Sequence, residues 1–464
     1  MKKLLMLAAA FAGIQASALA QTELSSFSVV GRGGVMNTFV HDFQAIGVNP
    51  GNLGRSTSIV SFTIGEGGVG ASTQAMTRTT VNRFLEAAEN KELTLAARRD
   101  LAKAFTSDNV LNAGADFNTF ALSISLPKFG GLAISNRQRA LSHVAFNKNF
   151  SELVFLGQDA ELYKQYAPGQ TVYVSQLFEG TEIKASWVNE WNIAYGRKII
   201  DLPLLNIYGG AGYRYIQGMA LYEFSSKGGE VKAYSAASPI LDIDYDDYLN
   251  DPKFTYEDAD GLLSPVGRGH GFDVGLSAEI VKIVKVSASV TDIGKMTWTE
   301  NLLQAQDKGF KLPEVDGSEE YDFSEAADMA KTIIDSALVF SPVSELTTDL
   351  PTRFRAGVGV KIGEKVEVGL DYVRALNNAP GNISQDFVGL GIDVNPFSAL
   401  RLSTGVTTGA GDKFNLPVGI AIVTPVYEFG VSTRDVTAPF VEDNPGGSFA
   451  VGFLRFKIGK PKVL

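Results

Sequence analysis

The sequence of 464 residues contains no cysteine. This absence excludes a disulfide framework, a thiolate metal site, a cysteine nucleophile and a lipid-anchored amino terminus. The sequence also lacks an apolar run of the roughly 20 residues that a transmembrane helix needs, although 45% of its residues are hydrophobic. The hydrophobic residues must therefore be distributed singly among polar ones.

Positive charge is in deficit as well. There are 41 Lys and Arg residues against 51 Asp and Glu residues, so the formal net charge is −10. No basic stripe is present, which argues against a nucleic-acid partner. The histidines His41, His143 and His270 lie far apart, without a G-x-S-x-G or H-E-x-x-H motif beside them. We therefore expect no catalytic, metal-binding or cofactor-binding residues, and no enzymatic activity.

The first twenty residues have the pattern of a secretory leader. Lys2 and Lys3 precede an apolar run from Leu4 to Ile14, and Ala18-Leu19-Ala20 offers a cleavage site before Gln21. We predict a signal peptide over residues 1–20, and its removal would bring the net charge to −10 − 2 = −12. No Pro-rich or Ser-rich linker divides the remainder.

Apolar and polar residues alternate with a period of two in many segments. The segment 353–362 is representative, and 272–280, 366–372 and 388–394 repeat its pattern. In it the apolar face carries Phe354, Ala356, Val358, Val360 and Ile362, and the polar face carries Arg353, Arg355, Gly357, Gly359 and Lys361. Such alternation is typical of β-strands, in a membrane barrel or in an exported β-sandwich.

Three features favour a membrane barrel over the sandwich. The polar faces are rich in glycine and carry charges in mid-strand, as a wet lumen permits. The segments run to roughly 9 to 12 residues, near the length that a tilted strand needs to cross a bilayer. Short turns such as Gly363-Glu364 alternate with long polar insertions. We therefore predict an all-β fold, a transmembrane antiparallel β-barrel over residues 58–464.

Strand-like segments can be followed along the whole chain. The count is about 14 to 15, and we choose 14 because single-chain bacterial barrels have an even number of strands. They lie near Ser58–Gly65, Asp116–Leu126, Gly131–Arg137, Glu182–Ile199, Leu205–Gly218, Met219–Phe224 or Glu230–Ala236, Gly271–Val281, Val284–Thr291, Arg353–Gly363, Lys365–Arg374, Asp386–Val394, Leu400–Thr407, Leu416–Val423, Val426–Arg434 and Ser448–Ile458.

Two insertions have helical periodicity. Residues 81–105 combine spaced apolar residues with many charges, and residues 323–340 place apolar residues at steps of three and four. Residues 151–166 are a weaker third candidate. Such helices could lie across the mouth of the barrel or cap extracellular loops.

The segment before the first strand, residues 21–57, is rich in turns. Its core, 41–54, is polar but interrupted by apolar side chains such as Phe43 and Ile46, and it contains the turn Asn49-Pro50-Gly51. These residues resemble the amino-terminal hatch of the FadL family of outer-membrane transporters, where an Asn-Pro-Ala turn is usual. The resemblance is closest to FadL-like barrels of Bacteroidota, and Gly51 departs from the family's alanine.

The resemblance implies an outer-membrane barrel of 14 strands, plugged by a hatch that includes Phe43, Ile46, Asn49, Pro50 and Gly51. It further implies uptake or passage of hydrophobic small molecules, with membrane lipid and lipopolysaccharide as surroundings. A plug that never moves is the alternative for the hatch. The alternative for the whole protein is a non-transporting anchor that docks a secretion-system or surface partner, as one related branch does.

Three further patterns have ordinary explanations. Gly65-x-Gly67-x-x-Gly70 has the letters of a dinucleotide-binding motif but no βαβ context, so we expect a glycine-rich turn. The acidic run from Asp242 to Asp260 lacks the glycine and glutamate of a calcium loop and is expected to be a solvated loop. Trp187, Trp191 and Tyr195 fit an aromatic girdle, with internal packing as the alternative.

Overall fold

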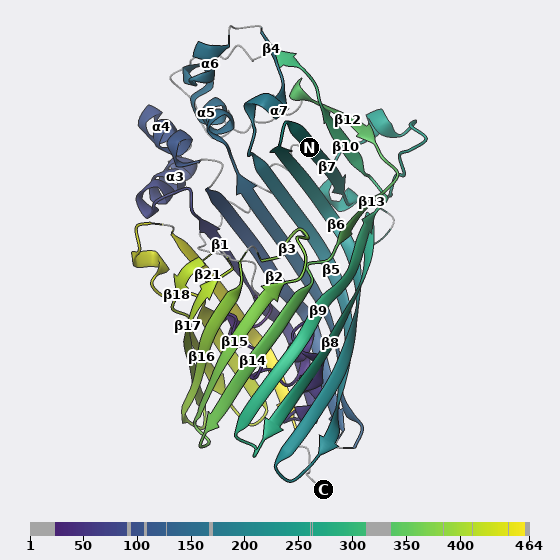
Figure 1. Ribbon diagram of the computed structural model, residues 1–464, viewed down its shortest axis with the longest axis vertical. Helices are drawn as coiled ribbons and strands as arrows, with labels where there is room; N and C mark the ends of the chain where they lie inside the picture. The colour runs from purple at the N-terminus through teal and green to yellow at the C-terminus, as the bar shows by residue number, and fades with distance from the viewer. Residues whose placement is uncertain are drawn as a thin grey trace.

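The computed structural model describes residues 24–90, 94–105, 109–126, 128–166, 170–259, 261, 263–311, 336–383, 385–410, 412–443 and 445–459. The predicted signal peptide, residues 1–20, lies outside these ranges. Within them the chain forms a closed, upright barrel with helices gathered at one end (Figure 1).

Fourteen strands of the described chain form the barrel wall, as the sequence predicts. Each pairs antiparallel with the next, and the pairing of the first strand with the last, from Val60↔Ile458 to Ser72↔Gly446, closes the ring. A closed sheet leaves no unpaired edge, which lipid does not tolerate. In order around the wall they are β1 (Val60–Thr73), β2 (Val110–Leu126), β3 (Gly130–Ala145), β5 (Glu182–Asp201), β6 (Leu205–Lys227), β8 (Gly267–Ile280), β9 (Val284–Trp298), β14 (Arg353–Ile362), β15 (Val366–Ala375), β16 (Phe387–Phe397), β17 (Leu400–Gly409), β19 (Val418–Val423), β20 (Tyr427–Thr433) and β21 (Gly446–Ile458).

The alternation in the sequence separates the two faces of this wall. On neighbouring strands Val358 and Leu370 are 46% and 50% exposed, whereas Arg355 and Asp371 are 3% and 1% exposed. The apolar residues therefore face outward to lipid, and the charged residues face the lumen. This arrangement explains how the chain can be rich in hydrophobic residues without a long apolar run.

Substitution of a lipid-facing residue by arginine should impair assembly far more than the same change in the lumen. Ile193 lies on the outer face of β5 and is 46% exposed, while Ser186 on the same strand lines a cavity in the lumen. We expect Ile193→Arg to cost about 2–4 kcal/mol and Ser186→Arg much less. Heat-modifiable mobility of the folded barrel in gels measures both. Equal loss of the folded band would contradict the assignment of faces.

The loops at one end of the barrel are long and structured, and the turns at the other end are short. Strand β6 continues past the barrel and pairs with β7 (Glu230–Ala237). β7 pairs with β10 (Leu303–Asp307), which in turn pairs with β12 (Leu338–Pro342). Four short strands remain. β4 (Thr171–Val172) pairs with β11 (Phe310–Lys311), and the other two are β13 (Leu346–Asp349) and β18 (Asp412–Asn415). By the rule for outer-membrane barrels the long loops mark the extracellular end.

Helices cover the extracellular end (Figure 1). The insertion predicted over 81–105 contains α3 (Arg78–Asn90) and α4 (Leu95–Ala104), and the weaker candidate over 151–166 contains parts of α5 (Lys148–Leu156) and α6 (Leu162–Gln165). With α7 (Val174–Leu177), β4, β7, β10, β11 and β12, these helices form what we call the crown. Its apolar cluster includes Leu101, Phe105, Phe150, Phe178 and Phe224. Among the helices of the described chain, none is both long and apolar enough to cross a bilayer.

Three predictions need correction. Of the two alternatives for one strand, residues 219–224 continue β6 and are not a strand of their own, whereas 230–236 lie in β7, outside the wall. Gly65 to Gly70 lie inside β1 rather than in a turn. The helix predicted over 323–340 cannot extend to its end, because Leu338 to Phe340 belong to β12; residues 323–335 lie outside the described residues. The glycines of β1 suit close approach to neighbours, since a Cβ on Gly67 would lie 2.2 Å from the Asp116 carbonyl oxygen.

Candidate functional site

Residues 24–55, called the hatch from here on, fill the lower half of the barrel lumen (Figure 1). They contain only short helices, namely α2 (Phe27–Val30), η1 (Phe43–Ala45) and η2 (Pro50–Arg55). Nearly all of their side chains are buried against the wall. In the described chain no backbone–backbone hydrogen bond joins the hatch to a barrel strand. The hatch is therefore held by side chains and not by the sheet.

Charged side chains of both signs line the lumen at the level of the hatch, and we call this set the inner charged ring. Buried charges are tolerated only when they are paired, and here acids on some strands lie against arginines on others, as Asp116 does against Arg137 and Asp273 against Arg214. The ring consists of Glu66, Asp116, Arg137, Arg139, Glu190, Arg214, Asp273, Asp292, Arg353, Arg355, Asp371, Asp393, Arg401, Glu428 and Arg455.

Arg214 is the centre of one half of the ring. Its side chain is 1% exposed, and its guanidinium nitrogens lie 2.9 Å from Asp273 Oδ1, 2.7 Å from Asp292 Oδ1 and 3.7 Å from Glu190 Oε2. Gly47 of the hatch packs directly on it, since a Cβ there would lie 3.0 Å from Arg214 Nη2. Gly47 also has φ +71°, so glycine is the residue that fits in both respects.

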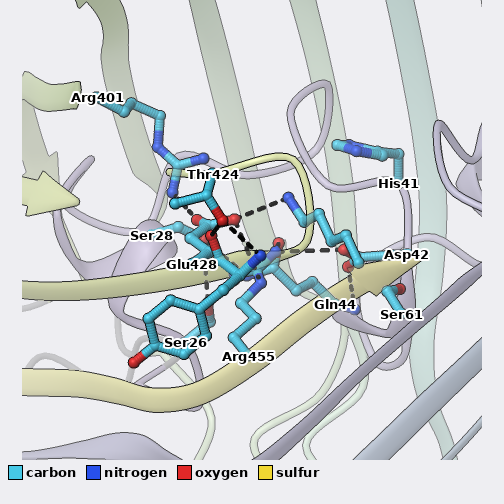
Figure 2. A network of polar contacts seen from close by, with 12 residues as sticks. Ser26, Ser28, His41, Asp42, Gln44, Ser61, Arg401, Thr424, Glu428 and Arg455 are labelled. Atoms are coloured by element: carbon cyan, nitrogen blue, oxygen red, sulfur yellow. Dashed lines mark hydrogen bonds and ion pairs between the residues drawn. The ribbon is translucent and has the colours of Figure 1, made fainter. Parts of the chain in front are cut away.

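Arg455 connects the other half of the ring to the hatch through hydrogen bonds and ion pairs (Figure 2). Its Nη2 donates to Asp42 Oδ2 at 3.2 Å and to Gln44 Oε1 at 2.9 Å, both in the hatch. Its Nη1 and Nε lie 3.5 Å from Glu66 Oε1 and 3.7 Å from Glu428 Oε2. The hydroxyl of Ser26 in the hatch donates to the same Glu66 oxygen at 2.6 Å. One wall arginine thus holds the hatch through a buried network.

Two acids on β15 and β16 hold the amino-terminal part of the hatch. Asp393 accepts a 2.8 Å hydrogen bond from Arg32 Nη1. Asp371 Oδ2 accepts hydrogen bonds from the backbone N–H groups of Met36, at 2.6 Å, and Asn37, at 2.8 Å. Hydrogen bonds to a charged group are stronger than neutral ones. The hatch is therefore clamped by β15 and β16 as well as by Arg455 of β21.

The predicted turn Asn49-Pro50-Gly51 lies in the seam between hatch and wall. Asn49 Nδ2 donates to the Leu276 carbonyl at 2.9 Å and to Ser287 Oγ at 2.7 Å, while Asn49 Oδ1 caps the turn by accepting from Gly51 N–H at 2.9 Å. A Cβ on Gly51 would lie 2.8 Å from the Gly275 carbonyl oxygen. This contact explains why glycine occupies the position where the resembled family usually has alanine.

The other predicted hatch residues lie nearby. Phe43 is 3% exposed and packs with Val48, Leu53 and the partly buried Ile46 in one apolar cluster. Arg455 lies over the Phe43 ring, 5.2 Å from its centroid. All five predicted residues therefore belong to the hatch–wall contact, whereas no sequence pattern singled out the inner charged ring. Its signal was the charge carried in mid-strand on the polar faces, as at Arg355 and Asp371.

A cavity of about 210 Å³ lies above the hatch, between the strands of β2, β3, β5 and β6. Leu24, at the start of the hatch, and the loop 378–382 complete its walls. A smaller cavity of about 20 Å³ lies between the hatch and the wall near Phe43 and Gln44. Arg137 borders both cavities, so this side chain lies between them at the edge of the hatch.

The three histidines are dispersed, as their positions in the sequence predict, and two of the three aromatic residues predicted to form a girdle on β5 are exposed. His41 lies in the hatch, and His143 lines the upper cavity. His270 lies on the outer face of the wall, where its ring stacks on that of Tyr213. Trp191 is 48% exposed and Tyr195 42% exposed. Trp187 is partly buried and donates to Gln138 Oε1 at 2.9 Å. Among the described residues no three His, Asp or Glu side chains form a metal-binding group.

Acidification should loosen the hatch through His41. Burial lowers the pKa of His41 to about 4, against the opposing pull of Asp42, so the docked hatch binds this proton less well than the released hatch does. The stability of docking is therefore complete above about pH 6.5 and falls as the pH drops toward 4. For this partly buried group we expect a loss of about 1–3 kcal/mol.

Hydrogen exchange of residues 35–55 at pH 7.5 and pH 5 measures this loss. Asp42 does not share the window: burial raises its pKa, but the charges of Arg455, His41 and Lys457 and the Gln44 N–H group together lower it below the usual value. In His41→Gln the protection factors, which remove the pH dependence of the intrinsic exchange rate, should change little over this range. If the variant keeps the full pH dependence, another group is responsible.

Comparisons with known proteins give one family and several solved barrels. Residues 50–429 match a family described as a family of unknown function (DUF5723). No curated protein matches the sequence. The solved structures that it resembles include the toluene transporters TbuX of Ralstonia pickettii (11% identity, TM-score 0.49, 94% of this chain and 99% of that chain) and TodX of Pseudomonas putida (9% identity, TM-score 0.49, 94% and 99%). A Pseudomonas aeruginosa FadL homologue is also similar (9% identity, TM-score 0.41, 95% and 98%).

The match to the family covers most of the barrel and begins within the hatch turn, at Pro50. The protein is therefore a transmembrane β-barrel that belongs to the DUF5723 family.

Proposed function

We propose that this protein is an outer-membrane channel for the uptake or passage of hydrophobic or amphipathic small molecules, with the hatch as a movable plug. The observation that carries the proposal is the cavity of about 210 Å³ directly above a hatch that is not part of the sheet. Its volume suits a small organic molecule. Side-chain contacts can be broken one by one, so the hatch can shift while the wall stays intact. The resemblance of the hatch turn to the FadL family adds to this argument.

Filling the cavity should slow uptake. Ser186 faces the cavity from β5, so Ser186→Trp would occupy much of the available volume. We expect uptake of a small aromatic solute into proteoliposomes to fall at least tenfold. The control is Glu230→Trp, which places the same side chain on the exposed tip of the β6–β7 hairpin. Undiminished uptake by correctly folded Ser186→Trp would contradict passage through this cavity.

A second candidate function is a docking protein for a secretion-system or surface partner. The feature that favours it is the crown, which has its own apolar cluster above the membrane. A docking role predicts a stoichiometric partner that co-purifies from membranes and an unchanged permeability when the hatch is altered. The channel predicts the reverse.

A further inference from the structure

The upper cavity has three levels, which the register of the strands defines. At the top, Asn112, His143, Lys184 and Glu223 are directly opposite one another on four adjacent strands. The next level inward consists of Leu141, Ser186 and Leu221, again in register. Arg139 and Asp116 lie opposite each other at the floor. A ligand in this cavity therefore meets an apolar band between two polar rows.

The cationic side chains that line the cavity already have partners. Arg137 Nε donates to Asp116 Oδ1 at 2.5 Å, and Arg139 lies between Asp116, at 3.9 Å, and Glu190, at 3.5 Å. Lys184 pairs with Glu182. On the far wall, Arg353 Nε donates to Asn382 Oδ1 at 3.0 Å. An anionic ligand would have to displace one of these partners to gain a counter-charge.

One charged group of the lining remains available. Glu223 is half-buried, and within the described chain it has no ion pair or hydrogen bond. A carboxylate only accepts hydrogen bonds. It therefore attracts a hydroxyl or an ammonium group and repels another carboxylate.

We infer that the upper cavity takes a small ligand whose apolar body lies along Leu141 and Leu221 and whose head group donates a hydrogen bond to Glu223. The inference rests on the proposed function and adds a head-group class to it: alcohols, phenols or amines, and not carboxylic acids. Selectivity follows from leaving the ion pairs of Arg137, Arg139 and Lys184 and the hydrogen bond from Arg353 to Asn382 intact while Glu223 accepts from the ligand.

Three aromatic probes of similar size test this selectivity: benzyl alcohol, benzylammonium and benzoate. Binding is measured by equilibrium dialysis of the full-length barrel in nanodiscs, with Ser186→Trp as the blank for partition into lipid. We expect benzyl alcohol and benzylammonium to bind at least tenfold more tightly than benzoate. Glu223→Gln should raise the affinity for benzoate and lower that for benzylammonium, each about tenfold. It should leave benzyl alcohol nearly unchanged, because the amide oxygen still accepts.

The control variant is Glu230→Gln on the exposed hairpin, which should change none of the three affinities. Equal binding of the three probes, or tightest binding of benzoate, would overturn the head-group inference and leave the proposed channel standing. If wild-type protein binds no probe beyond the Ser186→Trp blank, the proposed function fails together with the inference.

Discussion

Oxidation of a Val35→Cys/Gly391→Cys variant is expected to abolish uptake, and reduction is expected to restore it. Val35 in the hatch is fully buried, and its Cβ lies 2.9 Å from the position of a Cβ on Gly391 of β16. A disulfide needs roughly 3.5–4.5 Å between the Cβ atoms, so a shift of about 1 Å suffices. The native chain has no cysteine to compete for this bond.

The expected effect is large because the bond replaces reversible contacts by a covalent one. We expect oxidised protein to pass a small aromatic solute at least tenfold more slowly than reduced protein in the same proteoliposomes. The two single-cysteine variants are matched controls and should be insensitive to oxidant. Uptake at the same rate with and without the disulfide would show that transport does not require this part of the hatch to leave the wall.

Arg455→Leu should release the hatch without unfolding the barrel. The substitution leaves Asp42 and Glu66 buried without their arginine, and removal of one partner from a buried ion pair costs about 3–5 kcal/mol. Glu428 keeps its ion pairs with Arg401 and Lys457, so the wall itself loses less stability. We expect faster proteolysis within residues 24–55 and increased swelling of liposomes in a small hydrophilic solute.

Lys457→Leu is the matched control, because it removes a cation from the same network that has no contact with Asp42 or Gln44. It should leave both readouts near the wild-type values. If Arg455→Leu protein admits no more solute and is cleaved no faster than this control, the network of Figure 2 does not hold the hatch in place.

The error over residues 219–224 shows one limit of reading strands from periodicity. Gly218 pairs with Val188 and Ala220 with Trp187, so Met219 is an extra residue, a bulge in β6. A bulge inverts the alternation: Tyr213 and Tyr215 face outward on odd positions, but Ala220 and Tyr222 share that face on even ones. In the sequence this change of phase looks like the end of one strand and the start of another.

The contacts of the hatch show a second limit. Asp42 and Arg455 are 413 positions apart, and Arg32 and Asp393 are 361 apart. Residues 49–51 are recognisable because a turn is local, but which wall acid meets which hatch group depends on strand register and closure. Gly51 illustrates the same point, since its departure from alanine is explained only by the Gly275 carbonyl that it touches.

By itself the sequence determined the class of this protein: a closed antiparallel barrel, a polar lumen, an apolar outer face and a turn-rich segment ahead of the first strand. These properties follow from alternation along each strand, which is a local pattern. The tertiary structure alone decided the inner charged ring, the clamping of the hatch and the three-level cavity. The physical reason is that buried charges and cavities depend on groups from strands that meet only when the barrel closes.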